Sequence, residues 1–482
     1  MSRLSDRLRR QFGEPSAARE VSSQPAGEGG HSGLQPPGPE LSGPLSALQR
    51  LRQIRNASCG LPAEASAPRL TLPAIATNPR RPVCRVPRLV LEEIERAGTS
   101  CLWGRLRLPP TYPHGAITLG DVMRVDGRVA AMLSGDEALS DFDPTRALFF
   151  DLETTGLLGG SGNLAFLAGA VRLEGGGDLV VHQVLIREPS EEPAALALLA
   201  ELLSEVEFLV SFNGKSFDRN VLADRFVMNR MSPSRVLELP HLDLLHPARR
   251  LFRGVLRGCG LGQIEEACLG VFRHESEVRG AEVPQRWFDF LHLGRMDLLE
   301  PVLEHNLVDI LSLVTLAGHL ARCLSDPGAA LPQPRALLGL ARLLLERGAA
   351  ERGEEILRLA AHGSPEDPVV YAALGLLAEQ LRKTDRHQEA LVIWRTMISA
   401  SGTSDLRPWR RAAIALEHRL GRSAEARELV ETLLGSLEGP DGLLAFEIEG
   451  FRHRLDRLVR RAAVSRAGRA RAGDPDRAGC AG

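Results

Sequence analysis

The sequence predicts an α/β domain, built as three layers around a mixed sheet, followed by an all-α domain of helical repeats. From Ala147 onward the patterns run three strands, a helix, a strand, a helix, a strand and then helices. Such an order is typical of α/β folds. From about residue 335 only helical patterns occur, and similar segments recur. The chain has 482 residues, which is more than one domain usually contains.

The first part of the chain differs in composition from the rest. Residues 1–87 are rich in Pro, Gly, Ser and Ala, so we expect a disordered, low-complexity segment with one short helix at Leu45–Ile54. Residues 88–146 are expected to form a small lead-in subdomain. Within it, "LVLEEIERAG" predicts a short helix and "AITLGDVMRVDG" a strand or loop.

The α/β domain is predicted over residues 147–325. Its first strand is "ALFF", and a hairpin joins "NLAFLAGAVRLEGG" to "DLVVHQVLIRE" through a Gly-rich turn. The helix "EEPAALALLAELLSEV", the strand "EFLVSFNG", the helix "KSFDRNVLADRFVMNR" and the strand-to-helix segment "HLDLLHPARRLF" follow. A strong amphipathic helix from about Leu298 to Leu324 ends the domain.

Residues 335–450 contain three similar helical segments, in which Glu355, Glu389 and Glu425 recur at spacings of 34 and 36 residues. This is close to the period of tetratricopeptide repeats, which have two helices each. An ordinary helical bundle is the alternative. The repeats would bind a partner protein or help to guide a substrate. The Arg-rich tail, residues 451–482, is expected to fray into disorder.

Composition excludes some classes of protein. The net charge is −2, and the basic residues are nearly all arginine, with Lys215 and Lys383 as the only lysines. No overall basic field therefore attracts nucleic acid. Seven scattered cysteines contain no C-x-x-C pair, which predicts reduced thiols rather than a zinc site or disulfides. Without an apolar leader or an obvious apolar span, we expect a cytoplasmic protein that uses no membrane.

Acidic residues stand at three informative places. Asp151 and Glu153 end the first strand two residues apart, so their side chains share one face and repel unless a cation lies between them. Asp218 stands in the first turn of a helix, and His305 and Asp309 are four apart on the last helix. Each feature alone has an ordinary structural explanation, because strand ends, helix starts and solvated helix faces are often polar.

Together these motifs resemble, in order and in the elements that carry them, the DEDD exonucleases. Residues 147 to about 325 look like the RNase H-like fold of that superfamily. With "GGSGN" after the first motif and tetratricopeptide-like helices behind the domain, the arrangement resembles the YprB-like bacterial proteins, predicted 3'-5' exonucleases. The lead-in segment is weakly similar, and the first 85 residues carry no resemblance.

The resemblance implies a metal-dependent 3'-5' exonuclease that hydrolyses phosphodiester bonds at 3' ends of single-stranded DNA or RNA. Two divalent ions, Mg²⁺ or Mn²⁺, would be held by Asp151, Glu153, Asp218 and Asp309, and His305 would be the general base. In the histidine subclass the base usually stands five residues before the aspartate, whereas here the gap is four. His292 and Asp297 have a gap of five, but Gly294 interrupts them.

Further residues are candidates for substrate contact. By resemblance, Thr154, Thr155 and Gly156 would contact the terminal nucleotide. Asn213 is a further candidate, and Phe217 could stack on a base or, as the commoner alternative, be a core aromatic. Gly159, Gly160 and Gly162 would let the backbone approach a nucleotide or simply form a turn. A basic cluster could contact phosphate or be a solvated helix face; it comprises Arg249, Arg250, Arg253 and Arg257. Asp243 is expected on a strand near the site, with no assigned role.

Two alternatives to the exonuclease remain at this point. One is a catalytically inert RNase H-like scaffold for protein interaction through the repeats. The other is a structure-specific endonuclease, because RNase H-like folds also support internal cleavage with carboxylate-held metals. Fold alone does not separate these functions.

Overall fold

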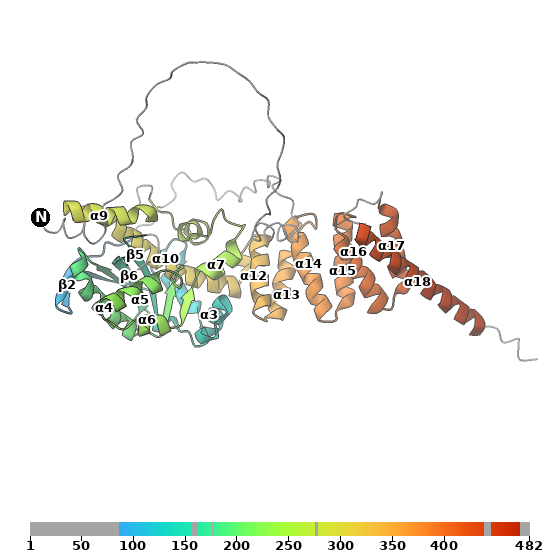
Figure 1. The fold of residues 1–482 in the computed structure, drawn as a ribbon, viewed down its shortest axis with the longest axis horizontal. Coiled ribbons are helices and arrows are strands. Elements are labelled where there is room, and N and C mark those ends of the chain that lie inside the picture. The colour runs from blue at the N-terminus through green and yellow to red at the C-terminus, as the bar shows by residue number, and fades with distance from the viewer. Residues whose placement is uncertain (1–85, 157–161, 176, 275–277, 438–444, 473–482) are drawn as a thin grey trace, which may run out of the picture. The chain divides into compact units, whose positions relative to one another are not determined.

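The computed structural model describes residues 86–156, 162–175, 177–274, 278–437 and 445–472, and it describes the side chains of all of these except residues 445, 446 and 465–472. All of these residues belong to one compact unit, Pro79–Gly482 (Figure 1). The predicted helix at Leu45–Ile54, the rest of the N-terminal segment up to residue 85, and Gly159 and Gly160 lie outside the described residues.

A seven-stranded mixed sheet forms the centre of the α/β domain, with the order β1-β2-β7-β6-β5-β8-β9. The pairs β5–β8 and β8–β9 are parallel, and the other pairs are antiparallel. The strands are β1 (Leu91–Arg96), β2 (Thr99–Leu108), β5 (Ala147–Thr154), β6 (Ala165–Leu173), β7 (Leu179–Leu185), β8 (Phe208–Ser211) and β9 (His241–Asp243). The predicted hairpin between β6 and β7 is confirmed.

Helices cover both faces of the sheet, as the alternation of side chains in β5 requires. Phe149 packs in the core that contains α10 (Glu300–Ser325), whereas Leu148 and Phe150 pack in the core that contains α4 (Glu192–Ser204). The other helices of the domain are α5 (Asp218–Met228), α6 (Ser234–Glu238), α7 (Leu245–Phe252), α8 (Leu261–Ile264) and α9 (Val283–Leu293). The predicted α/β fold with three layers is therefore confirmed.

The lead-in segment differs from its prediction. The helix expected at "LVLEEIERAG" is wrong, because Leu91–Arg96 form strand β1, which pairs with β2 across a turn at Ala97 and Gly98, both with positive φ. β2 in turn pairs with β7. The segment therefore extends the central sheet instead of forming a separate subdomain. Pairing with a neighbouring strand outweighs the helical preference of a Glu-rich stretch.

Between β2 and β5 the chain forms short elements. These are β3 (Pro113–His114), β4 (Ile117–Thr118), a 3-10 helix (Leu119–Arg124), α3 (Gly127–Ser134) and two further 3-10 helices (Glu137–Leu139 and Pro144–Arg146). A π-helix (Glu265–Leu269) follows α8, 3-10 helices (Gly280–Glu282 and Met296–Leu298) flank α9, and α11 (Pro327–Ala330) follows α10.

The helical region begins with three consecutive helix pairs. They are α12 (Pro334–Glu346) with α13 (Ala350–Ala360), α14 (Pro368–Lys383) with α15 (His387–Ser401), and α16 (Leu406–His418) with α17 (Ser423–Ser436). Ion pairs recur between successive pairs: Arg386, at the start of α15, reaches back to Glu354 of α13, and Glu425 of α17 pairs with Arg395 of α15. The all-α region is confirmed, whereas its assignment to tetratricopeptide repeats, and a protein partner for it, stay predictions.

The tail is not frayed where the structure describes it. Helix α18 runs from Ala445 to Ala472, so the expectation of disorder from residue 451 is wrong for this stretch. Its arginines Arg454, Arg457 and Arg461 all pair with the buried Glu417 of α16. A spacing of three and four residues places them on one helix face, so a single acid on α16 anchors the helix.

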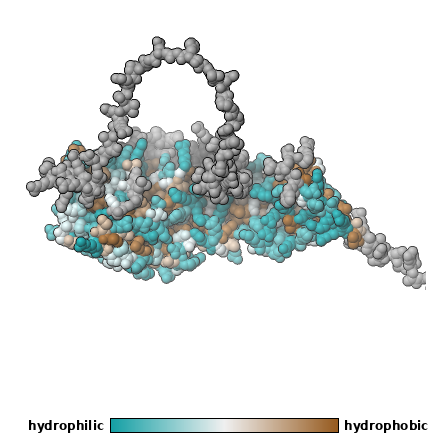
Figure 2. All heavy atoms as spheres, in the orientation of Figure 1, coloured by the Kyte–Doolittle hydropathy of each residue, from teal (hydrophilic) through white to brown (hydrophobic). Residues whose placement is uncertain are grey.

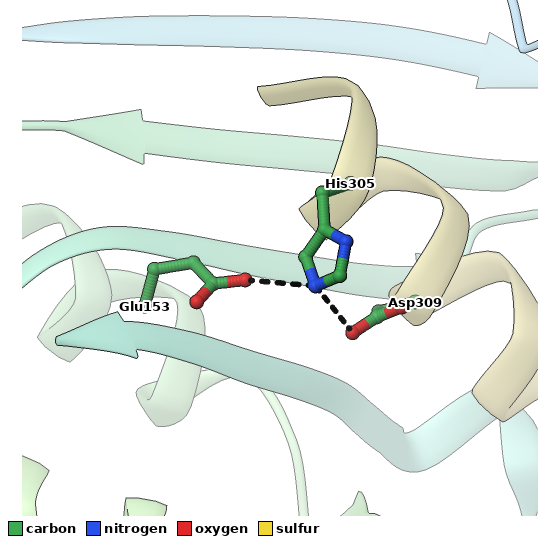
Figure 3. A group of neighbouring side chains, drawn as sticks. All are labelled: Glu153, His305 and Asp309. Atoms are coloured by element: carbon green, nitrogen blue, oxygen red, sulfur yellow. Dashed lines mark ion pairs between the residues drawn. The ribbon is translucent and has the colours of Figure 1, made fainter. Parts of the chain in front are cut away.

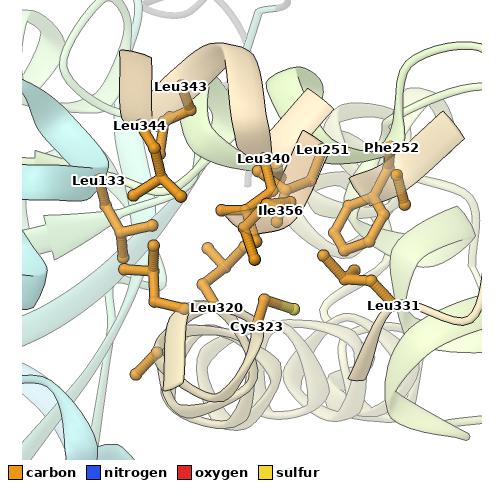
Figure 4. Close-up of a cluster of buried hydrophobic side chains, with 14 of the residues drawn as sticks. Leu133, Leu251, Phe252, Leu320, Cys323, Leu331, Leu340, Leu343, Leu344 and Ile356 are labelled. Carbon is orange, nitrogen blue, oxygen red and sulfur yellow. The ribbon is translucent and has the colours of Figure 1, made fainter. Parts of the chain in front are cut away.

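The two regions share one hydrophobic core. Leu251 and Phe252 of α7 and Leu320 and Cys323 of α10 pack in the same cluster as Leu340 of α12 (Figure 4). Leu133 of α3 and Ile356 of α13 belong to the same cluster. The helical region is therefore continuous in packing with the α/β domain, rather than joined to it by a bare linker.

One helix needs comment with respect to membranes. Among the described residues, the stretch Met296–Ser325 is long and apolar enough to cross a bilayer, which the sequence prediction did not anticipate. In the structure 89% of its most apolar window is buried inside the fold, as expected for a core helix. The face of the molecule in Figure 2 is predominantly hydrophilic, with scattered hydrophobic residues.

Candidate active site

Asp151 and Glu153 lie near the C-terminal end of β5, on the sheet face that carries α10. They alternate with the buried Leu152, as the two-residue period of a strand requires. A β-bulge follows between Glu153 and Thr154. The sequence prediction that both carboxylates share one face at the strand end is met by the structure.

Glu153 meets two side chains of α10. The Nε2 atom of His305 lies 3.8 Å from Oε1 of Glu153 and 3.6 Å from Oδ2 of Asp309 (Figure 3). One potential ligand atom from each of the three residues falls within 4.8 Å of the others. The three side chains are only 12–15% exposed. This group is a possible metal site.

Asp218 is positioned by the loop between β8 and α5. Asp243 on β9 accepts backbone N–H bonds from Asn213 (2.8 Å), Lys215 (3.2 Å) and Leu245 (3.0 Å), and so fixes this loop. Gly214 is tightly enclosed there, because a Cβ atom would lie 2.3 Å from Oγ of Ser211 and 2.9 Å from Oδ2 of Asp218. Asp243, for which the sequence suggested no role, thus holds the loop that presents Asp218.

The buried carboxylates perturb one another. Burial raises the pKa of Asp151, and the negative charge of Asp309 raises that pKa further. Burial, and then the charge of Asp151, raise the pKa of Glu153. Burial likewise raises the pKa of Asp218, with additional contributions from Asp151 and Glu153. Such a cluster of like charges in a poorly solvated place favours binding of protons or cations.

Asn306 is a member of the site that the sequence did not single out. This fully buried residue follows His305 and donates from Nδ2 to Oδ2 of Asp151 at 3.0 Å. Its Oδ1 accepts from Nε2 of Gln183 on β7 at 3.0 Å. Gly169 of β6 leaves the room for it, since a Cβ atom there would lie 2.3 Å from Oδ1 of Asn306. The only sequence signal was an amide on the apolar face of a core helix.

Arg273 and Glu265 were also missed. Glu265 has a fully buried side chain, and Arg273 binds both its oxygens, from Nε and Nη2, at 2.6 Å each. Arg273 also donates to Oδ1 of Asp309 and, at 3.1 Å, contacts Nδ1 of His305. Because a guanidinium only donates, Nδ1 is the acceptor and neutral His305 carries its hydrogen on Nε2. No sequence pattern links these residues, which approach only in the fold.

Two cavities flank the carboxylates. One, of about 260 Å³, is lined by Leu152, Glu153, Thr154, Gly156, Asn213, Phe217, Gly280 and Pro284. The other, of about 370 Å³, is lined by Leu261, Gly262, Arg273, His274, Val278, Arg279, His305 and Asp309. Four of the five predicted substrate-contacting residues therefore line the first cavity.

Thr155 is the fifth, and it lines neither cavity. Its backbone N–H bonds the carbonyl of Leu164, and its hydroxyl accepts from the N–H of Leu164 and donates to Oδ1 of Asn163. Thr155 therefore ties together the two ends of the chain segment that separates β5 from β6. Gly162 lies in that segment with open space around its Cα, so the structure does not require a glycine there for lack of room.

Other candidates lie away from the carboxylates. The four arginines at and after the end of α7 are exposed, line neither cavity, and include Arg250, which pairs with Glu346 of α12. His292 bonds the carbonyl of Phe288, and Asp297 pairs with Arg295, both at exposed positions. The structure therefore places neither His292 and Asp297 nor the arginine cluster of α7 in this site.

Comparisons with known proteins agree with this geometry at the level of the fold. Residues 148–321 match the family model of the RNase_H superfamily. The chain is 29% identical over 370 residues to the uncharacterized protein YprB of Bacillus subtilis (strain 168), an alignment that covers 75% of this chain and 86% of that protein. The chain thus carries an RNase H-like domain, and its similarity to YprB extends well beyond that domain.

A similarity to a solved structure is weaker. The family B DNA polymerase of the hyperthermophilic archaeon Pyrobaculum calidifontis aligns with a TM-score of 0.32 and 18% identity. The alignment covers 44% of this chain and 30% of the polymerase, so this chain spans less than a third of that relative's length. A TM-score this low carries no functional inference.

Proposed function

We propose that this protein is a metal-dependent 3'-5' exonuclease that acts on single-stranded DNA or RNA. The supporting observation is the convergence of Asp151, Glu153, Asp218 and Asp309, from β5, α5 and α10, within an RNase H-like domain. Nucleases of this fold generally depend on divalent metals, and hard oxygen ligands of this kind suit Mg²⁺ or Mn²⁺.

The charge of the cluster supports a cation cofactor. The carboxyl pKa values of Asp151, Glu153 and Asp218 are raised because their charges are buried close together. Two divalent ions would offset four negative charges. When bound, they would hold the scissile phosphodiester and stabilise the charge that develops on it. Asn306 would keep Asp151 in its orientation, and the loop fixed by Asp243 would do so for Asp218.

His305 is the candidate general base in this proposal. Its Nε2 atom faces Glu153 and Asp309, where an attacking water would stand. While Arg273 donates to Nδ1, however, Nε2 carries the hydrogen. We therefore propose that His305 accepts a proton at Nε2 only after its imidazole has turned away from Arg273, so that Nδ1 can carry the hydrogen instead. The four-residue spacing from Asp309 is compatible with this geometry, because one helical turn places both side chains on the same face.

The test is cleavage of 5'-labelled single-stranded DNA and RNA with Mg²⁺, Mn²⁺ or EDTA. We expect a metal-dependent ladder that shortens from the 3' end and is absent with Asp151→Ala. Asp141→Ala is the matched control, since Asp141 is an exposed acid lining a cavity at the other end of the strands. Internal cuts would instead support the endonuclease, and no cleavage by the unmodified protein on either substrate would support the inert scaffold.

A further inference from the structure

We infer that the cavity formed by Arg273, His274 and Arg279 is a subsite for the backbone phosphate next to the scissile one, on its 5' side. Nothing in the motifs or comparisons assigns a role to these three residues. The inference rests on the proposed exonuclease function, and it adds the path that the remaining strand takes away from the metal centre.

The charge of the two cavities differs. The smaller cavity has one charged residue among its lining residues, Glu153. The larger cavity contains Arg273, Arg279 and His274, and it reaches His305 and Asp309. Among the described residues, the smaller cavity is lined by no Arg, Lys or His, whereas the larger cavity is basic. Glu153, His305 and Asp309 thus lie between the two cavities.

This asymmetry matches binding of a strand at its end, which under the proposed function is the 3' end. A terminal nucleoside has no phosphate beyond the scissile one, so it suits the cavity that lacks cations and contains Phe217. In the opposite direction the strand carries one negative charge for each nucleotide, so it suits the basic cavity.

Arg273 is a fixed wall of the basic cavity. Its guanidinium group donates to both carboxylate oxygens of Glu265, whose side chain is fully buried. Breaking this pair would leave a charge buried without its partner, so the arginine stays in place while its outer edge faces Asp309 and His305. A cation that is already oriented binds phosphate without a further cost of ordering.

The lead-in segment holds in place the π-helix that carries Glu265, the partner of Arg273. The N–H of Ala116 bonds the carbonyl of Leu269 at 2.7 Å, at the end of the π-helix that carries Glu265. Gly115 has a positive φ, and a Cβ atom there would lie 2.2 Å from the same carbonyl. The neighbouring His114 is fully buried and bonds Ser312 of α10 at 2.8 Å. Residues 114–116 therefore fix the π-helix against α10.

Arg279 gives the cleanest test. It is exposed, and its replacement, unlike that of Arg273, does not leave the buried Glu265 without its ion-pair partner. Binding of a 5'-fluorescein-labelled ten-nucleotide oligothymidylate is measured by anisotropy in EDTA over a range of salt concentrations. For Arg279→Gln we expect the slope of log Kd against log salt to fall by about 0.7, the value of one single-strand phosphate contact. Arg279→Lys restores the slope, and Arg128→Gln, at an exposed position on α3 that lines neither of the two cavities, leaves it unchanged.

The position of the phosphate is tested with neutral methylphosphonate linkages placed one at a time from the 3' end. With the unmodified protein, the neutral group at the second linkage should weaken binding about as much as Arg279→Gln does. In Arg279→Gln the same group should then have no further effect. If the effects of Arg279→Gln and of the neutral group were coupled at the terminal linkage, or at no linkage, the proposed subsite would be wrong.

The two proposals fail separately. A protein that cleaves from the 3' end, while Arg279→Gln keeps the full salt slope, would reject the subsite and retain the exonuclease. Coupling at the second linkage without metal-dependent cleavage would reject the exonuclease and retain a basic binding cavity.

Discussion

Two buried acidic sites in this chain have opposite charge balance. In the helical region Glu417 is a single acid that pairs with Arg454, Arg457 and Arg461. Burial tends to raise its pKa, but the Arg457 hydrogen bond and the arginine charges lower it overall. At the end of β5, three carboxylates with raised pKa values stand near Asp309, and the arginine in the described contacts of this cluster is Arg273, which donates to Asp309.

The difference separates a structural ion cluster from a site that can take up cations. Glu417 is already neutralised by the protein and holds α18 in place. The β5 site remains short of positive charge, and this is why we propose that an external cation binds there. Burial of acids alone would not distinguish the two places, whereas the number of arginines that contact them does.

Among the variants that compare the two sites, the largest effect is expected at the β5 site from Asn306→Asp. The replacement keeps the size of the side chain but loses the N–H that orients Asp151 and adds a negative charge. We expect cleavage to fall by about 10- to 100-fold, as is typical when the partner of a metal ligand is lost. Single-turnover cleavage with Mn²⁺ measures this, with the exposed Asn220→Asp on α5 as control. Equal rates for the two variants would contradict a positioning role for Asn306.

Glu417→Gln should give the reverse outcome. Removing the acid leaves Arg454, which is only 16% exposed, without its anion. We expect the free energy of unfolding to drop by about 2 kcal/mol, below the usual cost for fully buried pairs, because Arg457 and Arg461 reach solvent. Urea unfolding measures this, and metal-dependent cleavage of the folded variant should stay unchanged. A loss of cleavage without loss of stability would refute the contrast between the sites.

The pH dependence of stability should follow the β5 site. Burial and neighbouring charges raise the pKa of Asp151 to about 7 and of Glu153 to about 8. Unfolded carboxyls titrate near ~4, so between pH ~4 and these values the folded protein holds protons that the unfolded chain has released. Stability without metal therefore falls as pH rises over this window, on the order of 1 kcal/mol.

Thermal unfolding from pH 5 to pH 8 in EDTA measures that fall. Asp151→Asn should flatten the dependence, because it removes one of the interacting charges. Added MnCl₂ should raise Tm more at pH 8 than at pH 5, since cations then bind deprotonated carboxylates. A Tm in EDTA that rises steadily with pH would show that the β5 carboxylates are not the groups that control stability.

The smallest effect is expected from Arg461→Gln on α18. This arginine is 57% exposed and lies 3.3 Å from Glu417, behind two closer arginines. An exposed pair of this kind contributes about 0.5 kcal/mol or less. Urea unfolding should therefore barely change, whereas Arg454→Gln, which is more buried, should cost clearly more. Equal costs for the two variants would mean that burial does not set the strength of this cluster.

The sequence alone determined the parts of the fold that depend on local periodicity. The β6–β7 hairpin, α4, α10 and the two-residue spacing of Asp151 and Glu153 were all predictable, because apolar periodicity and turn residues act over a few positions. The order of the acidic motifs also indicated which elements would converge. Where strand pairing decided, as in β1, a Glu-rich stretch predicted the wrong element.

Only the tertiary structure decided the partners of the site. Arg273 reaches Asp309 from 36 positions away, Gln183 reaches Asn306 from 123, and the arginines of α18 converge on Glu417. Such contacts depend on how sheets and helices pack, and no local pattern encodes them. The sequence therefore supplied the acids, and the fold decided which of them pair with arginine and which do not.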